Sequence, residues 1–322
     1  MKKFMLAVFL IFFSTILIAE TKTQFQGKLC NGTFQYNEKV FQGDALVIRM
    51  TISLREKKRF SKETKAIAIL QNEKKNLETV QFFFKNPKAK KQNTQELFAL
   101  VPISTWINGG KYNLKIVYEA FDAEAEKVSL PISVLEKKFV SETIPLNEKN
   151  TNIRTDNSRE RMAQIDKLNA ILSRVSPNNV FTLSQFIEPV QTTRRTSFFG
   201  DRRIYEYASG KKAIAEHYGI DYGVGEGTPV SACADGKVVL AENRNSTGWS
   251  IVIEHAPGLY SLYYHLSSLS VKEGSAVKQG EKIATSGSTG LATGPHLHWE
   301  VRLNACAVSP DFFCTNFAYQ TK

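Results

Sequence analysis

Polar and apolar side chains alternate along several stretches in the first half of this chain, and this pattern constrains the fold more than any other feature. The clearest runs lie within residues 46–54, 112–118 and 128–134. Alternation with period two gives a segment one buried face and one wet face, as in an antiparallel strand. The chain is therefore predicted to be mainly β, with an immunoglobulin-like β-sandwich at residues 20–135.

Residues 136–184 are predicted to be a linker that contains one helix. The sequence is polar and irregular up to residue 157, and apolar residues then recur at spacings of three and four. These residues are Met162, Ile165, Leu168, Leu172 and Val175. A residue among 156–158 is expected to cap the helix, and Pro177 is expected to end it. The apolar face of the helix must pack against one of the two flanking domains.

Short strands separated by glycines return after the linker. The candidate strands are residues 237–240, 250–254, 260–264 and 298–302. Closely spaced glycines between short strands are typical of a compact all-β fold with tight turns. Residues 185–310 are thus predicted to form a second domain built on an antiparallel β-sheet, and residues 311–322 a C-terminal tail.

The first 19 residues have the features of a secretory signal peptide. Two lysines follow Met1, an apolar run begins at residue 4, and the small residue Ala19 closes it. The run is shorter than the ~20 residues that a membrane-spanning helix needs, so cleavage is favoured over a retained anchor. The mature chain is therefore expected to be exported to the periplasm or cell envelope, without an integral membrane span.

The net charge of +11 is unevenly distributed along the chain. Residues 185–310 contain twelve basic and twelve acidic residues, so the excess positive charge lies upstream. A basic flank can attract anionic cell-wall polymers or acidic lipid surfaces, although a solvated lysine-rich surface is the simpler interpretation. Nucleic acid is not an expected partner, and the sequence leaves the oligomeric state open.

The chain contains four cysteines, Cys30, Cys233, Cys306 and Cys314. An exported chain can form disulfides, and four cysteines allow three pairings, among which the sequence does not decide. Cys306 and Cys314 are near enough in sequence to close a loop. They lack the spacing of a zinc-binding cysteine pair, so they are interpreted as structural or free.

All five histidines fall between residues 217 and 298, and this clustering indicates a site. His217 and Asp221 are four apart, and His296 and His298 are two apart, so each pair can share one face of a strand. Three of these four groups can close on one zinc ion and leave a fourth position open, as in a catalytic zinc site. Such a zinc polarises a carbonyl and lowers the pKa of water to near 7, as amide hydrolysis requires. The spacing alone does not say which of His296 and His298 binds the metal.

The two remaining histidines lie in different sequence contexts. His265 ends a strand-like stretch and accompanies the four candidate groups, which favours a role as general base or oxyanion donor. His255 follows an apolar run and has no evident partner in the sequence. It is interpreted as a structural residue or as one that supports the site from behind.

Six short motifs follow one another between residues 195 and 305. They are His217-x-x-x-Asp221, Gly227-Thr-Pro-Val230, Asp235-Gly-Lys-Val238, Tyr264-His265-Leu266, Ser286-Gly-Ser-Thr-Gly290 and Gly294-Pro-His-Leu-His298. In type and order they resemble the lysostaphin-type (LytM-like) zinc metallo-endopeptidases, which are cell-wall hydrolases. The resemblance implies a small antiparallel β-sheet groove with Zn²⁺ at its floor. It also implies a peptidoglycan hydrolase that cuts the peptide stems at a cross-link.

Carried over residue by residue, the resemblance assigns His217, Asp221 and His298 as the zinc ligands. It assigns His265 and His296 as the catalytic pair that orients the water and stabilises the transition state. Some members of the family also use a tyrosine upstream of the first ligand. Tyr205 or Tyr207 could fill that role here, but neither has the matching spacing.

Two other classes of function compete with a zinc endopeptidase. A regulatory peptidoglycan-binding protein of the same fold would activate another hydrolase without being an enzyme, but such relatives usually lack some ligands, whereas all five positions are present here. A wall-binding or adhesion module would act through the basic N-terminal domain. The sequence leaves open which bond is cut and whether the upstream segment is autoinhibitory.

Overall fold

The structure is a computed structural model that describes residues 20–55, 63–73, 75–89, 93–121 and 124–317. Strands dominate it, so the prediction of a mainly β chain is confirmed. The predicted signal peptide lies outside the described residues. Among the described residues, no helix combines the length and the apolar character that crossing a bilayer requires.

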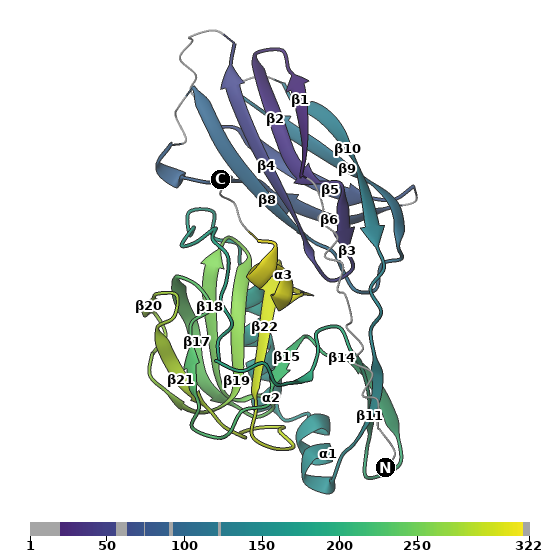
Figure 1. Ribbon diagram of the computed structural model, residues 1–322, viewed down its shortest axis with the longest axis vertical. Coiled ribbons are helices and arrows are strands. Elements are labelled where there is room, and N and C mark those ends of the chain that lie inside the picture. Colours follow the sequence, from purple (N-terminus) through teal and green to yellow (C-terminus); the bar gives the residue numbers. More distant parts are fainter. Residues whose placement is uncertain (1–19, 56–62, 74, 90–92, 122–123, 318–322) are drawn as a thin grey trace, which may run out of the picture.

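The N-terminal part consists of two five-stranded sheets (Figure 1). The first sheet, in spatial order, contains β1 (Glu20–Gln26), β2 (Cys30–Asn37), β4 (Ala45–Leu54), β8 (Thr94–Pro102) and β7 (Phe83–Phe84). The second contains β3 (Lys39–Phe41), β10 (Glu126–Leu135), β9 (Gly110–Glu119), β5 (Lys65–Gln71) and β6 (Asn76–Gln81). A 3-10 turn, η1 (Pro87–Ala89), lies between β7 and β8.

The alternating pattern of the sequence explains how these sheets pack. On β4, the side chains of Leu46, Ile48, Met50 and Ile52 are at most 1% exposed, whereas the residues between them are half-buried. Buried residues from both sheets join one hydrophobic cluster. Burial of apolar side chains at about 25 cal/mol per Å² stabilises this pairing of sheets.

The middle of the chain is more ordered than the predicted linker. It contains strand β11 (Ser141–Pro145), helix α1 (Glu148–Thr155) and helix α2 (Arg159–Leu172). β11 pairs in parallel with β13 (Arg202–Glu206), more than fifty residues further along. The prediction of an irregular segment up to residue 157 was therefore wrong, because its polar residues gain structure from a distant partner that no local pattern reveals.

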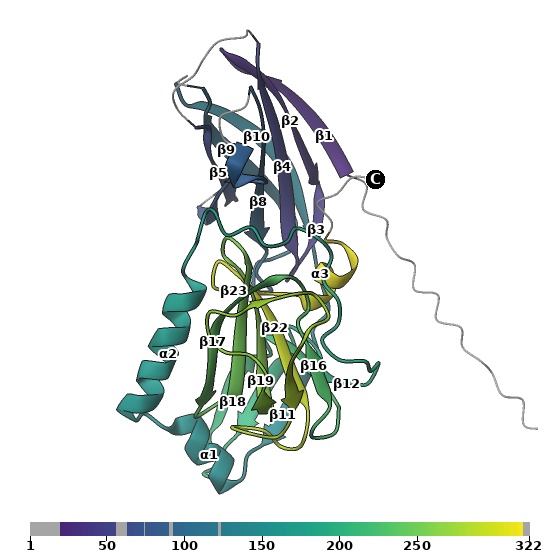
Figure 2. The ribbon, with the colours of Figure 1, turned by 90° about the vertical axis from the view of Figure 1, so that its left-hand side faces the viewer.

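Helix α2 is the helix that the periodicity predicted. Ser158 caps it, with its side chain accepting a hydrogen bond from the backbone N–H of Arg161. Its C-terminal half packs Leu168, Ile171 and Leu172 against the sheet of the C-terminal domain (Figure 2). Val175, which was predicted to share this face, lies beyond the last turn and is exposed.

The C-terminal domain is built on a large antiparallel sheet. Its main path runs β12 (Arg195–Ser197), β15 (Gly219–Tyr222), β22 (Leu297–Leu303), β19 (Leu259–Leu269), β18 (Gly248–Ala256), β17 (Gly236–Arg244) and β20 (Ala276–Val277). Strands β16 (Pro229–Ser231), β21 (Lys282–Ser286) and β23 (Cys306–Val308) pair off this path. β14 (Lys212–Glu216) pairs with β13 and completes a separate three-stranded sheet with β11. All four predicted strands lie within β17, β18, β19 and β22.

The end of the chain differs from the predicted tail at residues 311–322. Helix α3 (Pro310–Thr315) begins there, and Phe312, Phe313 and Phe317 are buried in the core of the C-terminal domain. Three large aromatic rings in this short stretch were the signal for burial. All four cysteines are free, so Cys306 and Cys314 do not form the loop-closing disulfide that their spacing allowed.

The two domains share a hydrophobic cluster. Phe83, Phe98 and Leu100 of the N-terminal sheets belong to the same buried group as Phe199 and Phe312 of the C-terminal domain. Polar contacts reinforce this interface from the loop that follows β8. Thr105 Oγ1 donates to Glu216 Oε1 at 2.6 Å, and Trp106 Nε1 donates to Glu216 Oε2 at 2.7 Å. The guanidinium of Arg202 lies 3.8 Å from the centre of the Trp106 ring.

Gly43 allows the two domains to approach closely. Its φ is +82°, and a Cβ built there would lie 2.5 Å from the Phe199 ring. We expect Gly43→Ala to lower the free energy of unfolding by about 1–3 kcal/mol more than Gly210→Ala, because it adds overpacking to backbone strain. Gly210 is the matched control, since its φ is +78° but its Cβ would meet nothing within 4 Å. Urea denaturation of both variants measures the difference, and equal losses would contradict the close approach.

Candidate metal centre

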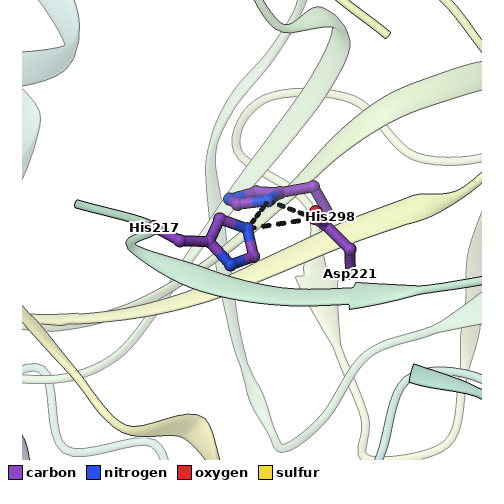
Figure 3. Close-up of side chains that lie close together, drawn as sticks. All are labelled: His217, Asp221 and His298. Carbon is purple, nitrogen blue, oxygen red and sulfur yellow. Dashed lines mark hydrogen bonds and ion pairs between the residues drawn. The ribbon is translucent and has the colours of Figure 1, made fainter. Parts of the chain in front are cut away.

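Three side chains from separate elements converge at one point of the C-terminal domain (Figure 3). His217 lies between β14 and β15, Asp221 lies on β15, and His298 lies on β22 directly opposite Asp221 in the antiparallel register. His217 Nε2 is 3.1 Å from Asp221 Oδ1 and 3.0 Å from His298 Nδ1. His298 Nδ1 is 2.7 Å from the same carboxylate oxygen.

The outer hydrogen bonds of the two imidazoles determine which atoms face inward. His217 Nδ1 lies 2.8 Å from the carbonyl oxygen of Phe198, which can only accept, so Nδ1 carries the proton and Nε2 presents a lone pair. His298 Nε2 donates to Glu300 Oε1 at 2.9 Å, which leaves Nδ1 as its inward acceptor. Two imidazole lone pairs and a carboxylate oxygen thus face one another. They repel unless a cation or a proton lies between them.

The electrostatics of the three groups fit a cation. Burial raises the pKa of Asp221, but the hydrogen bonds of His217 and His298 outweigh it and hold this pKa well below its ordinary value. Burial also lowers the pKa of His298, but Asp221 and Glu300 outweigh it and raise the pKa to about 9. When no metal is bound, a proton between these three groups is therefore favoured. Two histidines and one aspartate suit Zn²⁺ with an open position.

Charged residues that the sequence analysis missed hold these groups from behind. Arg203, on β13, pairs with the outer oxygen of Asp221 at 2.5 Å. Glu300 is buried against His298, and Arg302 Nε donates to its second oxygen at 2.6 Å. Period two along β22 could have revealed Glu300 and Arg302, since both share a face with His298. Nothing local points to Arg203, because β13 is placed by pairing with β11 and β14.

His265 and His296 lie beside the three converging groups. Their ring centres are 4.7 Å apart, and the ring of His265 lies 6.2 Å from that of His298. His265 Nδ1 donates to the carbonyl of Thr289 at 2.7 Å, and His296 Nδ1 donates to the carbonyl of Gly294 at 2.8 Å. Each ring therefore keeps a lone pair on Nε2. That of His296 lies 3.9 Å from Asp221 Oδ1.

The backbone at His265 is strained. Its φ is +60°, in the left-handed region that a β-strand residue rarely adopts. The residue is buried, and its N–H donates to the carbonyl of Thr247 at 2.9 Å. Strain of this kind costs of order 1–3 kcal/mol and persists only where the surroundings enforce it, as they do at functional sites. No sequence pattern around His265 signals this conformation.

A cavity of about 340 Å³ opens onto the site. The cavity is lined by Asp221 and His298 of the metal centre and by His265 and His296. Leu291 and Pro295 line it as well. Ile144 of β11 and Asn150 of α1 also line it, so the middle segment forms part of the cavity wall. Of the two tyrosines left open by the sequence, Tyr205 lines the cavity, whereas Tyr207 lies at the β13–β14 turn.

His255 is separate from this site and belongs to the core. It is fully buried on β18, with Nδ1 donating to the Asp235 carbonyl at 2.8 Å and Nε2 accepting from Ser261 Oγ at 2.7 Å. Its ring packs against Phe186 at 4.9 Å between centres. Of the two interpretations made from the sequence, the geometry favours the structural one.

The pH dependence of stability should report the burial of His255. Burial lowers its pKa to about 4, against about 6.5 in an unfolded chain. Between these values the unfolded chain binds more protons, so this contribution is complete above about pH 6.5 and is lost as the pH falls toward 4. From about pH 7.5 to about pH 4.5, we expect the wild type to lose about 3 kcal/mol more unfolding free energy than His255→Gln. Urea titrations at the two pH values test this, and parallel losses would rule it out.

The fold and the converging groups define a metallopeptidase type of centre. Residues 215–310 match peptidase family M23. This part of the chain is therefore a peptidase family M23 domain, and the resemblance to lysostaphin-type metallo-endopeptidases seen in the sequence is confirmed.

Relatives of known name match part of the chain. The DD-carboxypeptidase/endopeptidase Mpg of Neisseria meningitidis is 44% identical over 124 residues, which are 38% of this chain and 28% of that protein. The peptidoglycan DD-endopeptidase ShyA of Vibrio cholerae is 41% identical over 108 residues, which are 34% of this chain and 24% of ShyA. The chain thus spans about a quarter of the length of these curated relatives.

A solved structure resembles the chain over most of its length. It is a Pseudomonas aeruginosa protein described as an M23 peptidase candidate, with a TM-score of 0.57 and 23% identity over 87% of this chain and 96% of that one. At this identity the likeness concerns the fold alone. It extends the similarity beyond the M23 domain to the N-terminal sheets and the middle segment.

Proposed function

We propose that the protein is an exported zinc-dependent endopeptidase that hydrolyses peptide cross-links of peptidoglycan during cell-wall remodelling. The observation that carries this proposal is the convergence of three inward acceptors, on His217, Asp221 and His298, within an M23 domain. The names of Mpg and ShyA, with their DD-endopeptidase and peptidoglycan terms, support the substrate class. The sequence features of residues 1–19 support export to the periplasm or cell envelope.

In this proposal His217, Asp221 and His298 hold the metal. Zinc bound there supplies a Lewis acid that polarises the peptide carbonyl and makes water more acidic. Arg203 and Glu300 keep Asp221 and His298 aimed inward, because each binds the side of the ligand that faces away from the metal.

His265 and His296 act on protons beside the metal. Burial lowers the pKa of both His265 and His296, and the charges of the neighbouring histidines lower that of His265 further. Both rings are therefore neutral near pH 7. A neutral Nε2 can accept a proton from water and return it to the leaving amine. In its protonated form, the same nitrogen can donate a hydrogen bond to the developing oxyanion.

The alternative, a regulatory wall-binding protein with the same fold, is less well supported. A regulator needs the groove but has no need of a matched ligand set. Here the three acceptors are present, oriented by outer hydrogen bonds, and flanked by two imidazoles with free lone pairs. This arrangement favours an enzyme.

Digestion of purified peptidoglycan tests the proposal directly. The mature chain is incubated with sacculi as purified, after removal of metal with a chelator, and after zinc is restored. We expect new peptide termini, identified by mass spectrometry, in the first and third samples only. Intact sacculi in a sample that contains zinc-loaded, folded protein would refute the enzyme and favour the regulator.

A further inference from the structure

Arg194 is a cationic side chain without a partner at the edge of the active-site cavity. It directly precedes β12 and lines the cavity together with Asp221 and His298. Within the described part of the chain, its guanidinium has no hydrogen bond or ion pair. The two neighbouring arginines differ, because Arg195 pairs with Glu188 and Asp311, and Arg203 pairs with Asp221.

Gly223 creates the space in which the Arg194 side chain lies. The N–H of Gly223 donates to the Arg194 carbonyl at 3.0 Å, which places the two residues opposite each other beside Asp221. A Cβ on Gly223 would lie 3.1 Å from Arg194 Nε and 3.3 Å from its Cδ. It would also lie 2.8 Å from a methyl carbon of Thr196. The absence of a side chain at Gly223 thus leaves room for the Arg194 side chain beside the end of β15, at the edge of the cavity.

The charges around the cavity leave Arg194 as its available anion-binding group. Asp221 and Arg203 compensate each other. The remaining charged residue that lines the cavity is Glu142 on β11, whose charge repels anions. A guanidinium presents a planar fork of N–H donors that matches a carboxylate.

We infer that Arg194 binds a free carboxylate of the peptide substrate, next to the bond that is cut. This inference rests on the proposed function and names the class of peptide that the site takes. The carboxylate lies on the Asp221–Gly223 side of the metal, where it forms charge-assisted hydrogen bonds with the guanidinium. Peptides in which this carboxylate is an amide are poor substrates.

Cross-linked muropeptides in two forms test the inference. One form is natural, and in the other the carboxylates are converted to amides with carbodiimide and ammonia. For the wild type we expect kcat/KM to fall about tenfold to a hundredfold on amidation, as loss of a hydrogen bond between charged groups implies. For Arg194→Gln we expect kcat/KM on both forms to match the lower value that the wild type has on the amidated form. Glu142→Gln is the control that changes a charge in the same cavity, and it should keep the preference for the natural form.

Gly223→Ala provides a second test that leaves the arginine in place. The added methyl should displace the Arg194 stem and reduce the preference for the natural form, with zinc content unchanged. Gly225→Ala is its control, because a Cβ there meets nothing within 4 Å. Retention of the full preference by Arg194→Gln would overturn the inference, and so would equal rates of the wild type on both forms.

Failure of the proposed function would give a different result. If the wild type binds zinc but cleaves neither form, calorimetric binding of the two muropeptides decides the inference by itself. Weaker binding after amidation, together with weaker binding of the natural form by Arg194→Gln, supports it. The inference is overturned if the wild type binds the natural and the amidated form equally and Arg194→Gln binds the natural form as well as the wild type does.

Discussion

Replacement of Asp221 by alanine is expected to abolish zinc binding and peptidoglycan cleavage together. The carboxylate approaches both His217 and His298, so its loss removes the group that joins the other two ligands. It also leaves the half-buried guanidinium of Arg203 without its anionic partner. Removing one partner of such a pair is strongly destabilising, by about 3–5 kcal/mol where burial is complete and less here.

Metal analysis after dialysis against trace zinc measures the first part of this expectation. The wild type should retain about one zinc per chain, as a three-ligand site would, and Asp221→Ala should retain none. Asp166→Ala is the control, because Asp166 is an exposed aspartate on α2. Full zinc occupancy in Asp221→Ala would remove this residue from the ligand set.

Variants of the two lone-pair histidines should separate catalysis from metal binding. We expect His265→Ala and His296→Ala to retain zinc and to lose turnover by a factor on the order of 10² to 10³, as loss of a general base or an oxyanion donor implies. Zinc should remain because the inward nitrogens of His217 and His298 are oriented by other hydrogen bonds.

Paired measurements of zinc content and kcat test this separation. His255→Gln serves as the control, since His255 is a core residue whose loss affects stability without touching the cavity. Turnover of His265→Ala at the wild-type rate would assign that residue a structural role despite its strained backbone. Loss of zinc from His296→Ala would instead make it a ligand.

The sequence was informative where short-range patterns carry the structure. Period two predicted β4 and β9, and glycine punctuation predicted the short strands that carry His265 and His298. Motif spacing also selected the five side chains that the structure brings together, and the family resemblance, not the spacing, chose between His296 and His298 as ligands. Their roles in zinc binding and catalysis remain predictions.

The sequence was uninformative where distant segments determine the structure. β11 is polar and largely exposed, and it exists because it pairs with β13. Arg203 reaches Asp221 because pairing with β11 and β14 places β13, so its role has no local signature. The core that the two domains share has no local signature either, because Phe98 and Phe199 each belong to an ordinary apolar pattern of their own segment.

This shared core changes the expectation for an isolated C-terminal fragment. The sequence predicted a second domain at residues 185–310. Removing the residues before 185 would expose Phe199 and Phe312 to water, because they belong to the shared cluster and the ring of Phe199 packs against Gly43. It would also remove β11 and α1, which wall the cavity. The full mature chain is therefore the appropriate protein for the experiments above.

The contacts between the two domains bear on where the proposed endopeptidase could cut. Phe199 packs against Gly43, and Glu216 accepts hydrogen bonds from Thr105 and Trp106, so apolar and polar contacts join the N-terminal sheets to the domain of the metal centre. If these contacts persist while the N-terminal sheets rest on a polymer strand, His265 and His296 stay at a fixed distance from that resting point. That distance, together with the spacing of the polymer strands in the wall, would then determine which bonds the metal centre can reach.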